Sequence, residues 1–265
     1  MSEVEVVRRG RVLEITLNKP KANAIDRPMS QMMGRAFALL RDDPDLWCAI
    51  LTAAGDRIFS AGWDLKALHQ GEMALNNWWE EDYGDGGFAG LTENWNLNKP
   101  VICALNGMAI GGGFEIAMSC DLIIAADHVE FGLPELPLGI VPDAGALQRL
   151  PRLIPRNIAN EMFLMGRRMP AAEAAHYGLV NRVVGKQELM TTARDWADRI
   201  AASAPLAMQT VKEVERTIQC LPLERAFAEM RNGDLPTYRA MLASEDAKEG
   251  VAAFAEKRPP MFKGR

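Results

Sequence analysis

The chain has 265 residues, of which 48% are hydrophobic and 25% are charged, and its formal net charge is −5 at pH 7. These values are ordinary for a soluble globular protein that is long enough to bury a sizeable core. The acidic balance and the lack of a basic stripe argue against nucleic acid or an anionic membrane as a partner. No apolar run reaches about 18 residues and the polar N-terminus does not resemble a signal peptide, so we expect a cytoplasmic protein.

The cysteines and histidines give no sign of a metal site or a disulfide framework. Cys48, Cys103, Cys120 and Cys220 are widely spaced and form no C-x-x-C pair. We therefore expect free thiols in a reducing compartment. The three histidines have no metal-ligand spacing such as H-E-x-x-H, and we expect no bound metal.

The first part of the chain predicts a sheet followed by a helix. Residues 4–7 and 12–17 flank a charged turn that contains Gly10, which is typical of a β-hairpin. Apolar residues at helical spacing predict a helix over residues 29–40. Residues 47–52, a short apolar run, predict a strand that is buried on both faces.

The next segment, FSAGWDLK at residues 59–66, combines a turn with a possible helix start. Asp64 is placed to cap a short helix, and the Gly62-Trp63 pair would leave backbone donors free just before it. These donors could bind an oxyanion, and the alternative is a plain transition from loop to helix.

Residues 71–90 are rich in Trp, Asp, Glu and Gly without a clear period, so we weigh a substrate-covering lid against a partner contact.

Three glycines at 111–113 lie between an apolar run, residues 101–105, and a helix-like run, residues 114–120. This order predicts a strand, a tight turn and a helix start, whose free N–H groups and positive dipole end can hold an oxyanion. Glu115 lies in the first turns of that helix, and Glu135 follows in a loop. Two carboxyl groups near an oxyanion site suit proton transfer next to a carbonyl. The alternative is close backbone packing, with a glutamate favoured by the helix dipole.

The rest of the chain is mainly helical. Helical patterns cover residues 143–153, 157–164, 170–176 (with proline at the first position) and 186–202, and residues 179–184 predict a strand.

From Pro205 onward we find no further strand signal. We therefore divide the chain into an α/β core, residues 1–200, and a C-terminal helical region, residues 201–265. A region of this size buries little surface alone, so we expect it to pack against the body or against another subunit.

The glycine run lacks the Lys-Ser/Thr of a P-loop, and no G-x-G-x-x-G follows a strand, which makes nucleotide binding a weak interpretation.

Three motifs occur in order along the chain: SAGWDLK at 60–66, NGMAIGGGFE at 106–115 and LPELPLGIVPDAG at 133–145. Together they resemble the crotonase, or enoyl-CoA hydratase/isomerase, superfamily, and the resemblance covers nearly the whole chain. It implies a spiral of β-β-α turns with a C-terminal helical region that joins three subunits, often as paired trimers. It also implies reversible syn addition of water across the 2,3 bond of a short-chain acyl-CoA thioester. Coenzyme A is then part of the substrate, and no separate cofactor is expected.

The resemblance also implies roles for individual residues. The backbone N–H groups of Trp63 and Gly112 would form the oxyanion hole for the thioester oxygen, and Glu115 and Glu135 would transfer the protons. The coenzyme A moiety would run along the Lys21-Ala22 loop and the turn at residues 63–66, although a solvated surface role is the alternative for either lysine. The residues expected to contact the substrate are Lys21, Ala22, Ala61, Asp64, Leu65, Lys66, Gly111 and Asp143.

Asp143 departs from the family pattern, because typical enoyl-CoA hydratases read PGAGG where this chain reads PDAGA. The superfamily's aryl-CoA dehalogenases use an aspartate at this motif position as a nucleophile, but the presence of both glutamates favours water chemistry. The Trp of SAGWDLK, this Asp and the FKGR terminus are most similar to family members that act on carnitine-like acyl groups. Asp143 therefore either pairs with a trimethylammonium group, with an aromatic such as Trp63 adding a cation–π contact, or caps the following helix at Ala144.

Two other functions stay open from the sequence. Double-bond isomerisation needs only one well-placed acid and fits the same superfamily. A non-catalytic acyl-CoA-binding or RNA-binding protein is the alternative of another class, and the acidic charge argues against RNA.

Overall fold

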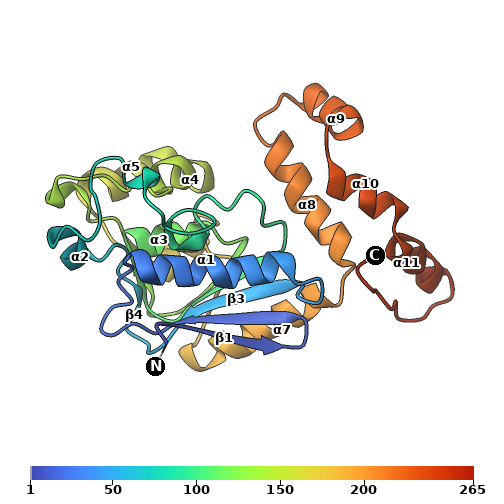
Figure 1. The fold of residues 1–265 in the computed structure, drawn as a ribbon, viewed down its shortest axis with the longest axis horizontal. Coiled ribbons are helices and arrows are strands. Elements are labelled where there is room, and N and C mark those ends of the chain that lie inside the picture. The colour runs from blue at the N-terminus through green and yellow to red at the C-terminus, as the bar shows by residue number, and fades with distance from the viewer. Residues whose placement is uncertain (1) are drawn as a thin grey trace.

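A computed structural model describes residues 2–265 and shows two sheets surrounded by helices (Figure 1). The first sheet has six strands in the order β1-β2-β3-β5-β7-β10. They are β1 (Val4–Arg9), β2 (Val12–Leu17), β3 (Cys48–Ala53), β5 (Val101–Leu105), β7 (Leu122–Ala126) and β10 (Arg182–Val184). The second sheet has the order β4-β6-β8-β9. Its strands are β4 (Ile58–Ser60), β6 (Met108–Ile110), β8 (Glu130–Gly132) and β9 (Met169–Pro170).

The hairpin and the buried strand that the sequence predicts are both present. β1 and β2 pair antiparallel with Val4 opposite Leu17 and Arg9 opposite Val12. β2, β3, β5, β7 and β10 then pair in parallel. Every residue of β3 is buried, as expected for an apolar run in the middle of a parallel sheet.

The chain moves between the two sheets in a repeating order, which confirms the β-β-α spiral. β3 in the first sheet leads to β4 in the second and then to α2 (Leu65–His69). β5, β6 and α3 (Gly112–Met118) repeat this order. β7 and β8 repeat it again before α4 (Ala146–Leu153) and α5 (Arg156–Met165). Helix α1 (Arg27–Asp42), which begins two residues before the predicted helix, precedes the first of these turns.

Several boundaries differ from the sequence prediction. The glycine turn follows β6 rather than β5, because the chain crosses from the first sheet to the second between them. Helix α6 (Ala171–His176) begins one residue later than predicted, since Pro170 ends β9 and precedes the helix as its N-cap. β10 starts at Arg182, and residues 179–181 form a loop in which the Asn181 N–H donates to the Ile123 carbonyl. Helix α7 (Leu189–Ala201) is preceded by the short 3-10 helix η4 (Lys186–Glu188).

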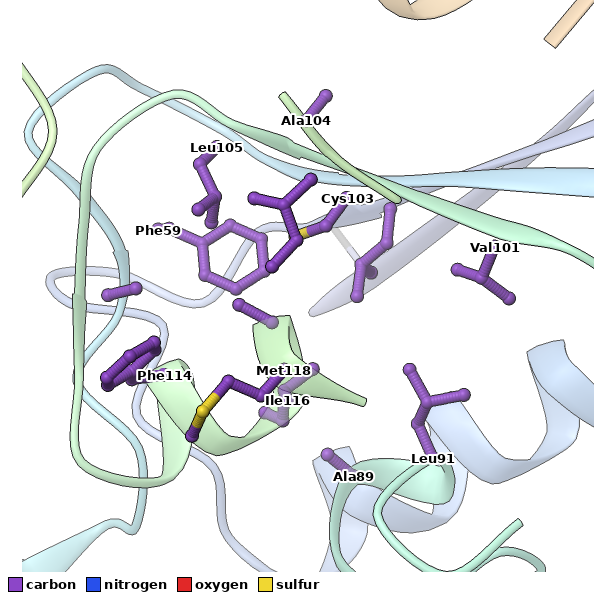
Figure 2. Close-up of a cluster of buried hydrophobic side chains, with 14 of the residues drawn as sticks. Phe59, Ala89, Leu91, Val101, Cys103, Ala104, Leu105, Phe114, Ile116 and Met118 are labelled. Atoms are coloured by element: carbon purple, nitrogen blue, oxygen red, sulfur yellow. The ribbon is translucent and has the colours of Figure 1, made fainter. Parts of the chain in front are cut away.

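A buried apolar cluster fixes α3 between the sheets and the neighbouring loop (Figure 2). Phe114 and Ile116 of α3, Phe59 of β4, and Leu105 of β5 are all fully buried. Interiors are close-packed, so a helix held on this many sides has little freedom to shift. The cluster therefore sets the position of the glycines and of Glu115 at the start of α3.

Four helices form the C-terminal region: α8 (Pro205–Ile218), α9 (Leu223–Asn232), α10 (Pro236–Ala243) and α11 (Glu245–Ala255). Figure 1 shows them extending away from the body as an arm, with α10 beside α8. Glu213 of α8 joins these two helices, because its carboxylate accepts the backbone N–H groups of Thr237 and Tyr238. None of the described helices has both the length and the apolar character needed to cross a membrane.

Candidate active site

Two backbone segments from different turns of the spiral meet at Gly62 and Gly112. A Cβ atom on Gly62 would lie 2.4 Å from the Gly112 nitrogen, so only glycine permits this approach. Ile25 fixes the first segment, since its N–H donates to the Gly62 carbonyl and its carbonyl accepts the Asp64 N–H. In such a parallel bridge the N–H of the residue between, Trp63, points away from Ile25.

The start of α3 supplies the second backbone donor. Gly111 has a φ of +55°, and a Cβ there would lie 2.7 Å from Oε1 of Glu135. Gly112 is the first residue of α3, where a helix leaves its N–H groups without an internal partner. Within residues 2–265, the N–H groups of Trp63 and Gly112 donate no backbone hydrogen bond, and both residues line one cavity. Two free donors on one cavity wall can hold an oxyanion.

This cavity has a volume of about 310 Å³ and brings together residues that are far apart in the sequence. Its walls include Ala61, Trp63, Leu65, Gly111, Gly112, Glu115, Glu135 and Asp143. The remaining wall is largely apolar and includes Leu68, Leu75, Trp78, Leu138, Ile140 and Val141. A mostly apolar cavity with a few convergent polar groups is typical of a small-molecule site.

Glu115 is 2% exposed and projects from α3 toward the start of α4. Its Oε1 accepts the Ala146 N–H at 2.9 Å. The pKa of Glu115 is raised to about 8, mainly by burial and to a smaller extent by the nearby charges of Glu135 and Asp143, against the lowering effect of the hydrogen bond from Ala146. The carboxyl is thus held in place and retains its proton near neutral pH.

Glu135 lies beside Gly111 of the glycine turn, just before the 3-10 helix η3 (Leu136–Leu138). It is 8% exposed, and its Oε2 is buried without a hydrogen-bond partner. Burial raises the pKa of Glu135 to about 7, with a smaller contribution from the charge of Asp143. The cavity therefore holds two carboxyl groups whose pKa values lie close to neutral pH, which suits general acid–base chemistry.

Asp143 does not cap a helix, so that alternative from the sequence analysis is wrong. Helix α4 begins at Ala146, and Gly145 precedes it without a side-chain cap. The Asp143 carboxylate instead accepts the indole N–H of Trp78 at 2.9 Å. Asp143 thus lies on the cavity wall, tied to a segment 65 residues away in the sequence.

The aromatic residues of segment 71–90 pack over Trp63. The Trp63 ring stacks on Phe88 with centroids 5.4 Å apart and meets Trp78 edge-on at 5.1 Å and 88°. Tyr83 lies 5.8 Å from Trp63, and burial raises the pKa of its hydroxyl to about 12. Leu75 and Trp78 line the cavity, so this segment forms one of its walls. The excess of aromatic residues was the sequence signal for this role, but it did not single out Trp78.

The other residues expected to contact the substrate divide into two groups. Ala61, Leu65 and Gly111 line the cavity, whereas Lys21, Ala22, Asp64 and Lys66 lie outside its walls. The Asp64 carboxylate caps α2 by accepting the N–H groups of Lys66 and Ala67. The Ala22 carbonyl accepts the Ala61 N–H, and the Lys21 and Lys66 side chains are exposed.

Two charged residues near the site were not found from the sequence. Lys19 forms ion pairs with Asp26 and Asp64, so its charge is already balanced. Arg149 of α4 donates to the Thr92 carbonyl, and its positive charge lowers the pKa of Glu115 slightly. A single arginine in a helical pattern carries no sequence signal for such a position.

Comparison with known proteins identifies the family of this chain. The enoyl-CoA hydratase/isomerase family model matches residues 8–265. Carnitinyl-CoA dehydratases of Shigella flexneri and of Escherichia coli strain K12 are each 54% identical over 266 residues, which is 100% of this chain and 100% of each relative.

Solved structures agree as well. A probable enoyl-CoA hydratase/isomerase from Mycobacterium abscessus has a TM-score of 0.87 and 41% identity, covering 100% of both chains. An enoyl-CoA hydratase from Mycobacterium tuberculosis H37Rv has a TM-score of 0.88 and 38% identity over 99% of both chains. The chain therefore belongs to the enoyl-CoA hydratase/isomerase family and is an enzyme of the hydratase type.

Proposed function

We propose that this enzyme adds and removes water across the 2,3 bond of a short-chain acyl-CoA whose acyl group carries a quaternary ammonium, such as crotonobetainyl-CoA and carnitinyl-CoA. The observation that carries the choice of acyl group is the Asp143 carboxylate in the same cavity as Glu115 and Glu135. The carnitinyl-CoA dehydratases that are 54% identical to this chain support it.

The thioester oxygen binds between the N–H groups of Trp63 and Gly112. Negative charge develops on this oxygen as an enolate forms at the α-carbon. Two donors that are already fixed by the backbone stabilise this charge more than they stabilise the neutral carbonyl, and they need no rearrangement during the reaction.

Glu115 and Glu135 transfer the two protons. With pKa values of about 8 and about 7, the pair carries about one proton at a pH between these values. One carboxyl can then deliver a proton to Cα while the other takes a proton from the attacking water. Elimination uses the same groups in the opposite direction, because both directions share one transition state.

The acyl end of the substrate faces Asp143 and the rings of Trp63 and Trp78. A carboxylate beside two aromatic rings is the chemistry that recognises a quaternary ammonium group. The cation–π contribution is about 0.5–2 kcal/mol for each well-placed ring.

The coenzyme A moiety leaves the cavity past Leu65 and reaches the surface near Lys21 and Lys66. Leu65 lines the cavity and follows the Asp64 cap, and both lysines are exposed and free to meet phosphate groups. We also propose that the subunits form a trimer, or a pair of trimers, through the helical arm.

The test measures turnover of crotonyl-CoA and crotonobetainyl-CoA by the wild type and by Asp143→Ala, following the absorbance of the conjugated thioester. We expect the wild type to prefer the cationic substrate and Asp143→Ala to lose that preference, with Asp56→Ala as an exposed control that keeps it. Equal loss on both substrates, or no loss, would contradict the ammonium contact. Formation of a 3-enoyl product in place of the 3-hydroxyacyl product would instead identify an isomerase.

A further inference from the structure

The hydrogen bond between Trp78 and Asp143 connects two separate walls of the cavity. Trp78 belongs to η1 (Trp78–Glu80) in segment 71–90 and is 5% exposed. Its ring is held edge-on against Trp63, which fixes the direction in which its N–H points. Among the described residues, the Asp143 side chain makes no other hydrogen bond, so this indole alone determines where the carboxylate lies.

Asp143 also borders a second cavity, of about 340 Å³, whose walls include neither Glu115 nor Glu135. That cavity contains Arg149 and Arg152, whose guanidinium groups attract a carboxylate, and Glu93, which repels it. Two arginines outweigh one glutamate in net charge. An Asp143 side chain that is not held by Trp78 is therefore drawn toward the second cavity and away from the substrate.

We propose that Trp78 is a positioning residue that determines acyl-group specificity by holding the Asp143 carboxylate in the catalytic cavity. The inference rests on the proposed recognition of a quaternary ammonium by Asp143. It predicts that the indole N–H matters for cationic acyl groups only, because the oxyanion donors and the two glutamates do not contact Trp78 through hydrogen bonds.

The experiment compares Trp78→Phe with Trp79→Phe. Phenylalanine at position 78 retains an aromatic ring against Trp63 but removes the N–H donor. Trp79 is the next residue and is 59% exposed, so it controls for the loss of one tryptophan from the segment. For Trp78→Phe we expect kcat/KM for crotonobetainyl-CoA to fall about tenfold or more relative to crotonyl-CoA, as typical for losing a hydrogen bond to a charged group. For Trp79→Phe we expect no change in this ratio.

A double-mutant cycle and a rescue variant complete the test. In an Asp143→Ala background, Trp78→Phe should lower the ratio much less than in the wild-type background, because no carboxylate remains to be positioned and only the cation–π contribution of the ring changes. Trp78→His restores a ring donor and should keep more of the preference than Trp78→Phe, which also covers the case in which the phenylalanine variant folds poorly.

The outcomes separate the two proposals. A wild type that prefers the cationic substrate, with the same preference in Trp78→Phe, overturns the role of Trp78 alone. Equal loss in Trp78→Phe and Trp78→His also overturns it. A wild type without any preference overturns the quaternary ammonium substrate, and the role of Trp78 with it.

Discussion

At the scale of single residues, the cost of keeping two carboxyl groups in one apolar cavity should appear in the way the free energy of unfolding depends on pH. The folded pKa of Glu115 is about 8, against 4.5 for the same group in water. Between these values the folded chain keeps a proton that the unfolded chain has lost, so stability falls as the pH rises. Glu115→Gln removes this dependence, because an amide stays neutral and can still accept the Ala146 N–H. Relative to wild type, we expect the variant to gain about 2–4 kcal/mol between about pH 5 and about pH 9.

Urea unfolding of both proteins at the two pH values measures this gain. Glu224→Gln is the control, since Glu224 is exposed on α9 and forms no ion pair among the described residues. The wild type and the Glu115→Gln variant could instead lose the same amount of unfolding free energy as the pH rises. That result would show that Glu115 is ionised in the folded state.

The same two carboxyl groups are expected to be needed together for hydration. Glu115→Gln and Glu135→Gln each remove one proton-transfer group, and we expect either change to lower kcat for hydration by about 10²–10⁴-fold. KM should change much less, because the oxyanion donors are backbone groups that remain in place. Steady-state kinetics on crotonyl-CoA provides the measurement. Near-complete retention of turnover in one of the two variants would support an isomerase that uses a single acid.

At the scale of elements, the close approach of Gly62 to Gly112 can be tested against a second glycine. Gly62 has a φ of +78° and Gly55 a φ of +84°, but a Cβ on Gly55 meets nothing within 4 Å. Gly55→Ala should therefore cost only the backbone penalty, about 1–2 kcal/mol. Gly62→Ala must in addition separate the two segments that carry the oxyanion donors. We expect a larger loss of stability and a loss of kcat in Gly62→Ala only, measured by thermal unfolding and by turnover. Equal effects of the two substitutions would mean that the contact has no role.

How far the sequence predicts these elements depends on whether their signal is local. β3 was predicted because five of its six residues are apolar, whereas β6 and β8 have three residues each and too little pattern to recognise. The glycine turn and the helix that carries Glu115 were predicted because turn and helix signals are adjacent in the sequence, although the strand before the turn is β6 and not the predicted run at 101–105. The role of Asp143 could not be decided in the same way. A helix cap depends on neighbouring residues, but the actual partner, Trp78, is brought to it only by the fold.

At the scale of the whole molecule, the arm of α8 to α11 exposes more apolar surface than four helices can cover for themselves. Leu223, Val251, Phe254 and Met261 are between 72% and 87% exposed. Large apolar side chains exposed in this number on one region mark a protein–protein contact, and closed symmetry makes three equivalent contacts a stable solution. We therefore expect light scattering after size-exclusion chromatography to give about 88 kDa, three times the 29.2 kDa chain mass, or twice that value for paired trimers.

Charge introduced on the arm should break this assembly. For Val251→Asp combined with Phe254→Asp we expect a shift toward 29.2 kDa, because an aspartate buried in an apolar contact has no partner for its charge. Val7→Asp on β1 is the control, since Val7 is also 58% exposed but lies in the body, at the outer strand of the first sheet. A wild type that elutes as a monomer would contradict the trimer. If the double aspartate variant of the arm has the same mass as the Val7→Asp control, the arm is not the contact surface. The apolar side chains of α11 would then need another partner.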